Sequence, residues 1–104
     1  IGGVNMVFDV KDEKVYIYDL EEIDISNFNE FKKSVISFIP KPGIKTIILN
    51  FEKMNYIDSA GVGCIISIIK EVKRSNKKLI VTGLNKRIEK IFKMTGLESM
   101  VEFL

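Results

Sequence analysis

Residues 58–63, with the sequence DSAGVG, are the part of the chain whose residue types and spacing could carry chemistry. Ser59 offers a hydroxyl beside the carboxylate of Asp58, and an apolar run typical of a helix follows. The free N–H groups and the dipole at a helix start favour a bound anion. Aspartate and serine are also the commonest helix caps, and the spacing alone favours a cap.

Gly61 and Gly63 distinguish this helix start from an ordinary cap. Each glycine costs a helix about 1 kcal/mol relative to alanine, so a helix that needed only a cap would gain nothing from them. A first turn without side chains lets another backbone or a bulky group approach closely. The two glycines therefore favour a binding surface at this position.

The chain has 104 residues and no histidine. A Ser-His-Asp or Cys-His catalytic site is therefore impossible, and we expect a binding domain rather than an enzyme. No group of carboxylates has the spacing of a calcium loop, so we expect no metal and no cofactor. The net charge of +2 comes from balanced lysines and acids, which argues against direct binding of nucleic acid.

The length fits a single domain over residues 1–104. The single cysteine, Cys64, cannot form an internal disulfide, which suits a reducing cytoplasm. The longest apolar stretch, 62–69, is far shorter than the roughly 20 residues that span a bilayer, so we expect no membrane association. Met6 is a candidate native start, in which case residues 1–5 would not belong to the natural chain.

Several strands are predicted from apolar runs bounded by turn residues. Residues 4–10 and 15–20 are predicted to form an antiparallel hairpin around a polar turn. Residues 46–49 and 79–82 are short, branched and apolar on both faces, which is typical of buried parallel strands. Residues 100–104 are expected to form a last short strand.

Three helices are predicted between these strands. The first begins at Asn27, which matches a capping box with Glu30, and it ends before two prolines. The second covers residues from about 59 to 75, and the third begins at Asn85 and ends at Gly96. This order predicts an α/β fold with a mixed, mostly parallel sheet, an N-terminal antiparallel hairpin and helices packed on the sheet. The carboxyl edge of such a sheet favours ligands and partners.

Four stretches of the sequence resemble the STAS family, the domain of anti-sigma factor antagonists and of the cytoplasmic tails of sulfate transporters. The central signature is ILNF at 48–51 followed by YIDSAGVG at 56–63. The segment LEEIDIS at 20–26 is similar to the early strand-to-helix region, while LIVTGL at 79–84 and MTGL at 94–97 match the next strand and a late helix end. The resemblance covers nearly the whole chain.

The resemblance implies that Ser59 is phosphorylated by a partner serine kinase that is also an anti-sigma factor. The unphosphorylated domain would bind that partner and release the sigma factor, and phosphorylation would switch the binding off. A PP2C-type phosphatase is a further partner in such a cycle. The domain is expected to be a monomer or a weak dimer.

The expected partner surface surrounds Ser59 and consists of Asp24, Tyr56, Asp58, Ala60, Gly61 and Val62. Asp24 matches an aspartate of the family that is expected near the phosphorylation site, or it caps the following helix. Asp58 orients the serine, or it caps its own helix. Glu21 occupies a position where many family members have glycine, which predicts an altered turn.

Two other functions stay open. A STAS adaptor or scaffold domain of a transporter or signalling assembly would use the same surface without phosphorylation. A sensor of nucleotides or small molecules is the third hypothesis, because some members of the family are reported to bind nucleotides. The sequence has no Gly-rich phosphate loop, which argues against the sensor.

Overall fold

The sheet begins with an antiparallel hairpin of β1 (Val7–Lys11) and β2 (Lys14–Tyr18). Asp12 and Glu13 connect them, and both have positive φ (51° and 66°), as in the two-residue turns whose twist matches that of the strands. The computed structural model describes residues 6–104. The predicted hairpin is confirmed from β1 onward, and its expected start at residues 4 and 5 lies outside the described residues.

The other strands of this sheet are parallel. β2 pairs with β4 (Thr46–Asn50), β4 pairs with β6 (Lys78–Thr82), and β6 pairs with the short β7 (Glu102–Phe103). The order across the sheet is β1-β2-β4-β6-β7. The predicted mixed, mostly parallel sheet is therefore confirmed.

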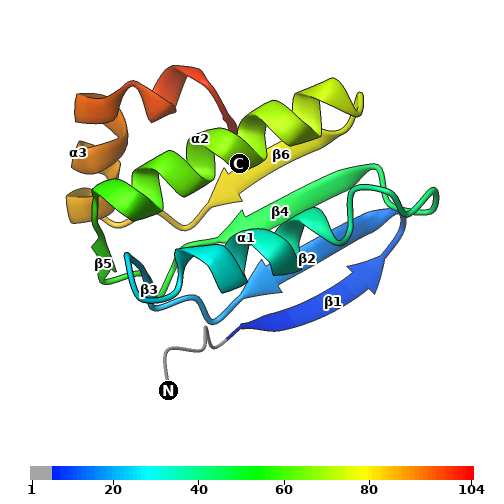
Figure 1. Ribbon diagram of the computed structural model, residues 1–104, viewed down its shortest axis with the longest axis horizontal. Helices are drawn as coiled ribbons and strands as arrows, with labels where there is room; N and C mark the ends of the chain where they lie inside the picture. Colours follow the sequence, from blue (N-terminus) through cyan, green and yellow to red (C-terminus); the bar gives the residue numbers. More distant parts are fainter. Residues whose placement is uncertain (1–5) are drawn as a thin grey trace.

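A separate pair of very short parallel strands, β3 (Glu22–Ile23) and β5 (Tyr56–Ile57), lies at the carboxyl end of the main sheet (Figure 1). Two residues are too few to show an alternating pattern, and the sequence indicated no strand at residues 56–57.

The carbonyl of Glu21, just before β3, accepts the N–H of Asn55 (2.7 Å). Glu21 is not at positive φ, so the backbone there does not need a glycine.

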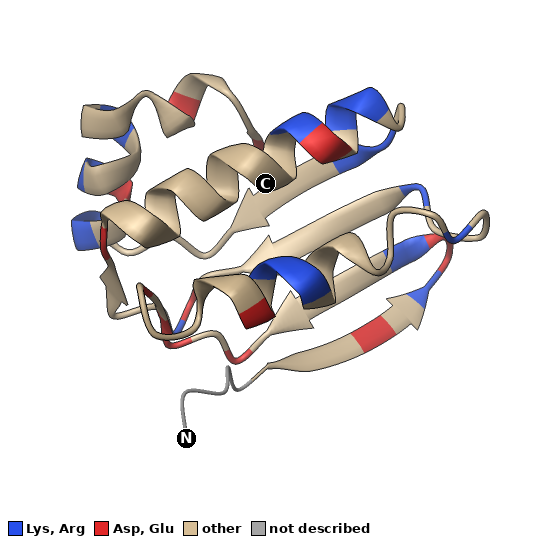
Figure 2. Ribbon diagram, viewed as in Figure 1, with Lys and Arg blue, Asp and Glu red and all other residues tan. Residues whose placement is uncertain are grey.

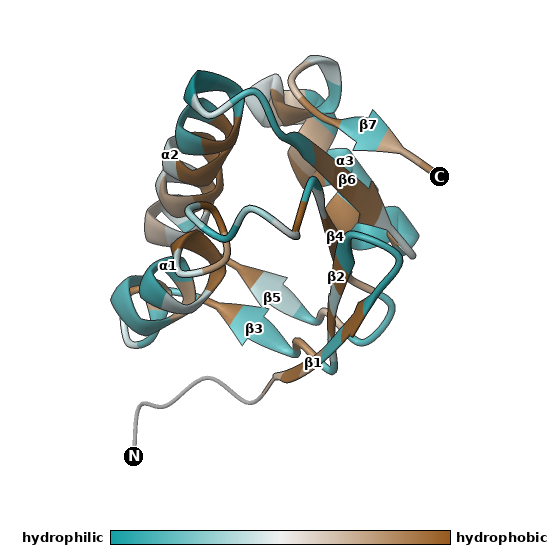
Figure 3. Ribbon diagram, turned by 90° about the vertical axis from the view of Figure 1, so that its right-hand side faces the viewer, coloured by the Kyte–Doolittle hydropathy of each residue, from teal (hydrophilic) through white to brown (hydrophobic). Residues whose placement is uncertain are grey.

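Helices α1 (Phe28–Ile36) and α2 (Ser59–Arg74) lie side by side over one face of the sheet (Figure 3). Helix α3 (Lys86–Thr95) lies near the start of α2 and is followed by the short turn η1 (Leu97–Ser99) (Figure 1). The side chain of Asn85 caps α3 by accepting the N–H of Ile88 (2.9 Å). Gly96 ends the helix with φ of 81°, so both predicted boundaries of α3 are confirmed.

The capping box predicted for Asn27 and Glu30 is wrong. Helix α1 begins after Asn27 without a side-chain cap. The Asn27 amide instead accepts the N–H of Asp24 (2.9 Å) and donates to the carbonyl of Glu22 (2.9 Å). Because Asn27 is only 5% exposed, its amide has to find partners inside the protein, and the end of β3 supplies them.

The core lies between the sheet and the two helices that cover it. The residues of β2, β4 and β6 that face these helices form two buried rows, which are Val15, Ile47 and Leu79, and Ile17, Leu49 and Val81. On α2, Ile65, Ile69 and Val72 are buried, whereas Val62 and Ile66 are only partly buried. Cys64 and Ile68 take part in the core instead. The buried stripe of α2 is thus rotated away from Val62, which faces α3.

Candidate functional site

Ser59 is the first residue of α2 and is exposed to solvent. The start of α2 lies beside β5 and α3 at the carboxyl end of the sheet, where the sequence placed it (Figure 1). Within residues 6–104, the Ser59 hydroxyl makes no hydrogen bond. The hydroxyl is therefore available to a partner or to a modifying enzyme.

Asp58 uses both carboxylate oxygens in the fold. One oxygen accepts the N–H of Gly61 (2.9 Å) and caps α2, and the other accepts the N–H of Ile25 (3.0 Å) in the loop before α1. The hydrogen bond from Gly61 lowers the pKa of Asp58, and the bond from Ile25 adds to this against the opposing effect of partial burial. The prediction that Asp58 caps its helix is confirmed, and the bond to Ile25 is an additional role that the spacing did not reveal.

Asp24 shapes the loop that carries Ile25. Its carboxylate accepts the N–H and the hydroxyl of Ser26 (2.9 and 2.6 Å). Its carbonyl accepts the N–H groups of Asn27 and Phe28 (3.1 and 2.9 Å), which leads the chain into α1. Asp24 is thus one residue from the contact with Asp58, and its carboxylate holds a turn instead of occupying the N-cap position.

The two glycines of the first turn of α2 have different surroundings. Gly61 is buried, and a Cβ added there would overlap the carbonyl oxygen of Ile23 and lie 2.9 Å from Cγ2 of Ile57. The space at Gly61 is thus used by β3 of the same chain, which corrects the expectation that this glycine admits a partner. Gly63 is exposed, and a Cβ there would meet nothing within 4 Å among the described residues.

An apolar groove of about 360 Å³ runs between α2 and α3 beside the serine. Its lining consists of Ile57, Asp58, Ser59, Val62, Ile91, Met94 and Thr95. Large apolar side chains are unusually exposed on and near this end of the molecule: Met94 is 75% exposed, Ile25 72% and Tyr56 53%. Solvated apolar groups gathered around a groove are typical of a protein interaction surface.

Sequence reasoning named part of this surface. It included Tyr56 and Val62 but missed Ile25, Ile91 and Met94. Ile91 follows Ile88 at a helical spacing that is typical of a core face, and no local pattern distinguishes Ile25 from a loop residue. The position of α3 across from the start of α2 brings Ile91 and Met94 to the groove beside Ser59. That position is set by tertiary packing, including the edge contact of Phe92 with Phe51 (6.1 Å between ring centres). Ile25 is held near this end by its hydrogen bond to Asp58.

Cys64 has a structural role. It is 4% exposed, and its thiol donates to the carbonyl of Phe28 (3.4 Å). Burial raises its pKa to about 11, against a weaker opposing effect of Lys32, so the nucleophilic thiolate is scarce at neutral pH.

Residues 6–104 contain no group of three potential metal ligands. Within the same part of the chain, no helix has the length and apolar character needed to cross a membrane.

The family model of the STAS domain matches residues 9–104. The chain belongs to the STAS domain family. The anti-sigma-B factor antagonist of Staphylococcus aureus is 29% identical over 80 residues, which cover 77% of this chain and 73% of the relative. The anti-sigma-B factor antagonist of Listeria monocytogenes is 24% identical over 102 residues, which cover 95% of this chain and 89% of the relative.

Solved structures share the fold of this STAS domain. A Thermotoga maritima protein proposed to be an anti-sigma factor antagonist has a TM-score of 0.86 at 26% identity, covering 94% of this chain and 84% of that chain. The Bacillus protein SpoIIAA has been solved unphosphorylated and phosphorylated. Both forms give a TM-score of 0.73 over 96% of this chain, at 22% and 24% identity, and cover 87% and 91% of SpoIIAA.

The glycines of α2 give a matched pair of substitutions. Gly61→Ala should destabilise the domain by about 1–3 kcal/mol, because the new methyl group collides with backbone that cannot move freely. Gly63→Ala should stabilise it by up to about 1 kcal/mol, because alanine favours the helix and has space here. Urea unfolding measures both values. Equal effects at the two positions would contradict the close approach of β3 to Gly61.

The Asp58 hydrogen bonds predict a specific pH dependence. The ionised carboxylate stabilises the fold above its unfolded pKa of about 3.8, and this contribution is lost as the pH falls through the lower folded pKa. Asp58→Asn keeps an oxygen for one N–H but turns its amide nitrogen toward the other. The variant should have a lower urea midpoint at neutral pH and a smaller loss of stability on acidification. Urea midpoints measured down to about pH 3 test this, and parallel pH profiles would contradict it.

Proposed function

We propose that this STAS domain is an anti-sigma factor antagonist whose binding is switched by phosphorylation of Ser59. In its unphosphorylated form it would bind an anti-sigma factor and release the sigma factor. The curated relatives are anti-sigma-B factor antagonists, and SpoIIAA is known in a phosphorylated form. The observation that carries the proposal is an exposed Ser59 hydroxyl, without a hydrogen bond in residues 6–104, at the edge of the α2–α3 groove.

The surface around Ser59 supports protein binding. The groove could receive an apolar side chain of the partner against Val62 and Ile91, while exposed Met94 and Tyr56 would be covered around it. Such buried contacts near the centre of an interface contribute most of the binding free energy. The neutral Ser59 hydroxyl at the edge of the groove could form a hydrogen bond with the partner. Burying it costs less desolvation free energy than burying a charged group.

A phosphate on Ser59 would change these conditions. It adds about −1.5 to −2 charges and three acceptor oxygens. The Asp58 carboxylate already takes the N–H of Gly61, so the phosphate adds negative charge beside an occupied cap. The fold should persist, because the Ser59 side chain is exposed and bonded to nothing in residues 6–104. A partner that covers the groove would have to desolvate the phosphate, and the free-energy cost opposes binding.

The partners follow from this cycle. The kinase would be the anti-sigma factor itself and would provide ATP and the catalytic base, so the STAS domain acts as a binding protein and as a phosphorylation substrate, and it needs no cofactor. A PP2C-type phosphatase would restore the binding form. The cycle would take place in the cytoplasm, where a sigma factor acts.

The switch is tested with the domain, its cognate anti-sigma kinase and ATP. Intact mass should show one added phosphate on the wild type and none on Ser59→Ala. The phosphorylated domain should bind the kinase roughly 100-fold more weakly than the unphosphorylated domain, because a buried charge is left unpaired. Calorimetry measures both affinities. Tight binding that phosphorylation does not change would favour the adaptor function instead.

The groove is tested with Met94→Glu. Met94 is 75% exposed, so the fold should tolerate glutamate, while the anti-sigma factor should bind about tenfold more weakly or worse. Val10→Glu is the matched control, since Val10 is 60% exposed on the edge strand β1 and lies outside the groove. Equal losses for the two variants would place the partner elsewhere.

A further inference from the structure

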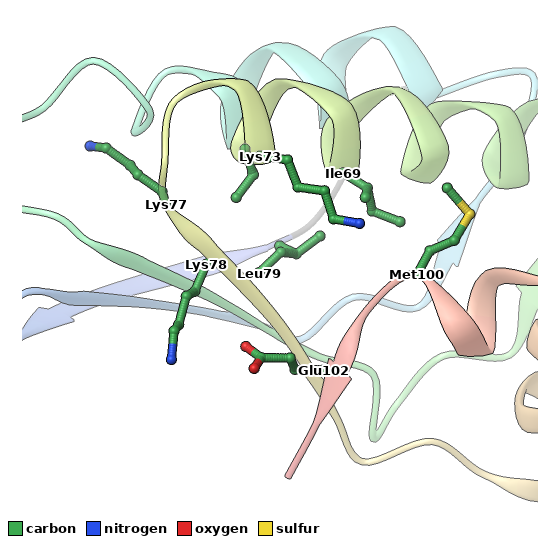
Figure 4. Close-up of a pocket in the computed structure, with 8 residues that line it drawn as sticks. Ile69, Lys73, Lys77, Lys78, Leu79, Met100 and Glu102 are labelled. Carbon is green, nitrogen blue, oxygen red and sulfur yellow. The ribbon is translucent and has the colours of Figure 1, made fainter.

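The opposite end of α2 carries a second apolar groove, of about 240 Å³, between α2, β6 and β7 (Figure 4). Its apolar lining is formed by Ile69, Val72, Leu79 and Met100. The first three of these are at most 6% exposed, so they form a floor and do not project from the surface. Met100 is only partly buried, so solvent reaches the apolar lining mainly at its side chain.

Lysines surround this floor. Lys73 and Lys78 line the groove from α2 and β6, and both are exposed. Figure 4 shows the Lys73 side chain extending between α2 and Leu79, whereas the side chains of Lys77 and Lys78 point away from this space. Lys77 donates to the carbonyl of Lys41 (2.7 Å), and Lys78 lies at the β6 edge of the groove. Among residues 6–104, neither Lys73 nor Lys78 has a carboxylate within 4.0 Å. One carboxylate, that of Glu102, lies on the β7 side of the groove.

Positive charge gathers at this end of α2, and a second basic group lies on α3 (Figure 2). Residues 70–78 contain five lysines and arginines and one acid, whereas residues 19–30, near Ser59, contain five acids and no base. Ser59 and Lys73 are about 21 Å apart along α2, from the rise of a helix. The basic groove is therefore separate from the surface proposed to bind the anti-sigma factor.

We propose that this basic groove binds an acidic amphipathic segment of another protein, which places one or two apolar side chains on the floor and carboxylates against Lys73 and Lys78. Charge complementarity and the recessed apolar floor together select this occupant. A nucleic-acid backbone would leave the apolar floor uncovered, and Arg74 is already paired with Glu71 (2.7 Å). A membrane surface would need projecting apolar side chains, and here they are recessed.

The test uses a fluorescein-labelled peptide of about 15 residues that is helical, glutamate-rich and carries a leucine and a phenylalanine four positions apart. It should bind the domain and shift the amide NMR signals of Lys73, Lys78 and Leu79 more than those of residues 57–62. The double substitution Lys73→Glu and Lys78→Glu should weaken binding about tenfold or more. The same charge change at Lys86 and Lys90, which are exposed on α3, should leave the affinity unchanged.

Four results with the peptide would overturn this proposal. These are no binding, shifts confined to the Ser59 end, equal losses for the two double variants, and binding that persists when the leucine and phenylalanine become alanine. Phosphatidylglycerol vesicles or a double-stranded DNA oligonucleotide that binds through Lys73 and Lys78 more tightly than the peptide would also overturn it, in favour of a membrane or nucleic acid. Because Ser59 is unchanged in every variant, failure here leaves the anti-sigma interaction intact, and binding to the anti-sigma kinase serves as a separate measurement.

Discussion

The carboxylate of Asp58 joins the first turn of α2 to the loop before α1 through the N–H groups of Gly61 and Ile25, and the site depends on this junction. Asp58 and Ile25 are 33 residues apart in the sequence, so the contact fixes two distant segments relative to each other. The junction is possible because Gly61 has no Cβ, which lets the carbonyl of Ile23 lie against the helix. Parallel pairing of β3 with β5 holds the same two segments together.

The polar groups that stabilise this junction are distinct from the Ser59 hydroxyl. Asp58, Asp24 and Asn27 use their polar atoms within the fold, and no buried side-chain N or O atom of residues 6–104 lacks a partner. The neighbouring hydroxyl of Ser59 makes no hydrogen bond within residues 6–104. Under the proposed function, phosphorylation of this hydroxyl would alter the partner surface without removing a stabilising interaction within residues 6–104.

Helix α2 also separates two kinds of surface. Its first turn lies beside exposed apolar side chains, between the acidic loop before α1 and the basic helix α3, and its last turns carry lysines beside a recessed apolar groove (Figure 2). The helix is held to the sheet along its length by Ile65, Ile69 and Val72, so its two ends keep a fixed separation. The net charge of +2 does not reveal this uneven distribution of charge, because a sum over the sequence carries no information about where the charges lie.

The sequence by itself determined the order of the main strands and helices, the mixed sheet, the caps at Asp58 and Asn85 and the end of α3 at Gly96, because each depends on local periodicity or on one residue beside a helix end. Tertiary structure alone decided the pairing of β3 with β5 and the hydrogen bond of the Asn27 amide to Glu22, which replaces the predicted capping box. It also decided the close approach of the Ile23 carbonyl to Gly61. It also brought Ile25 and Met94 to the same end of the molecule as Ser59. These features join segments far apart in the chain, and a close approach between such segments follows from how the whole core packs and not from any local pattern.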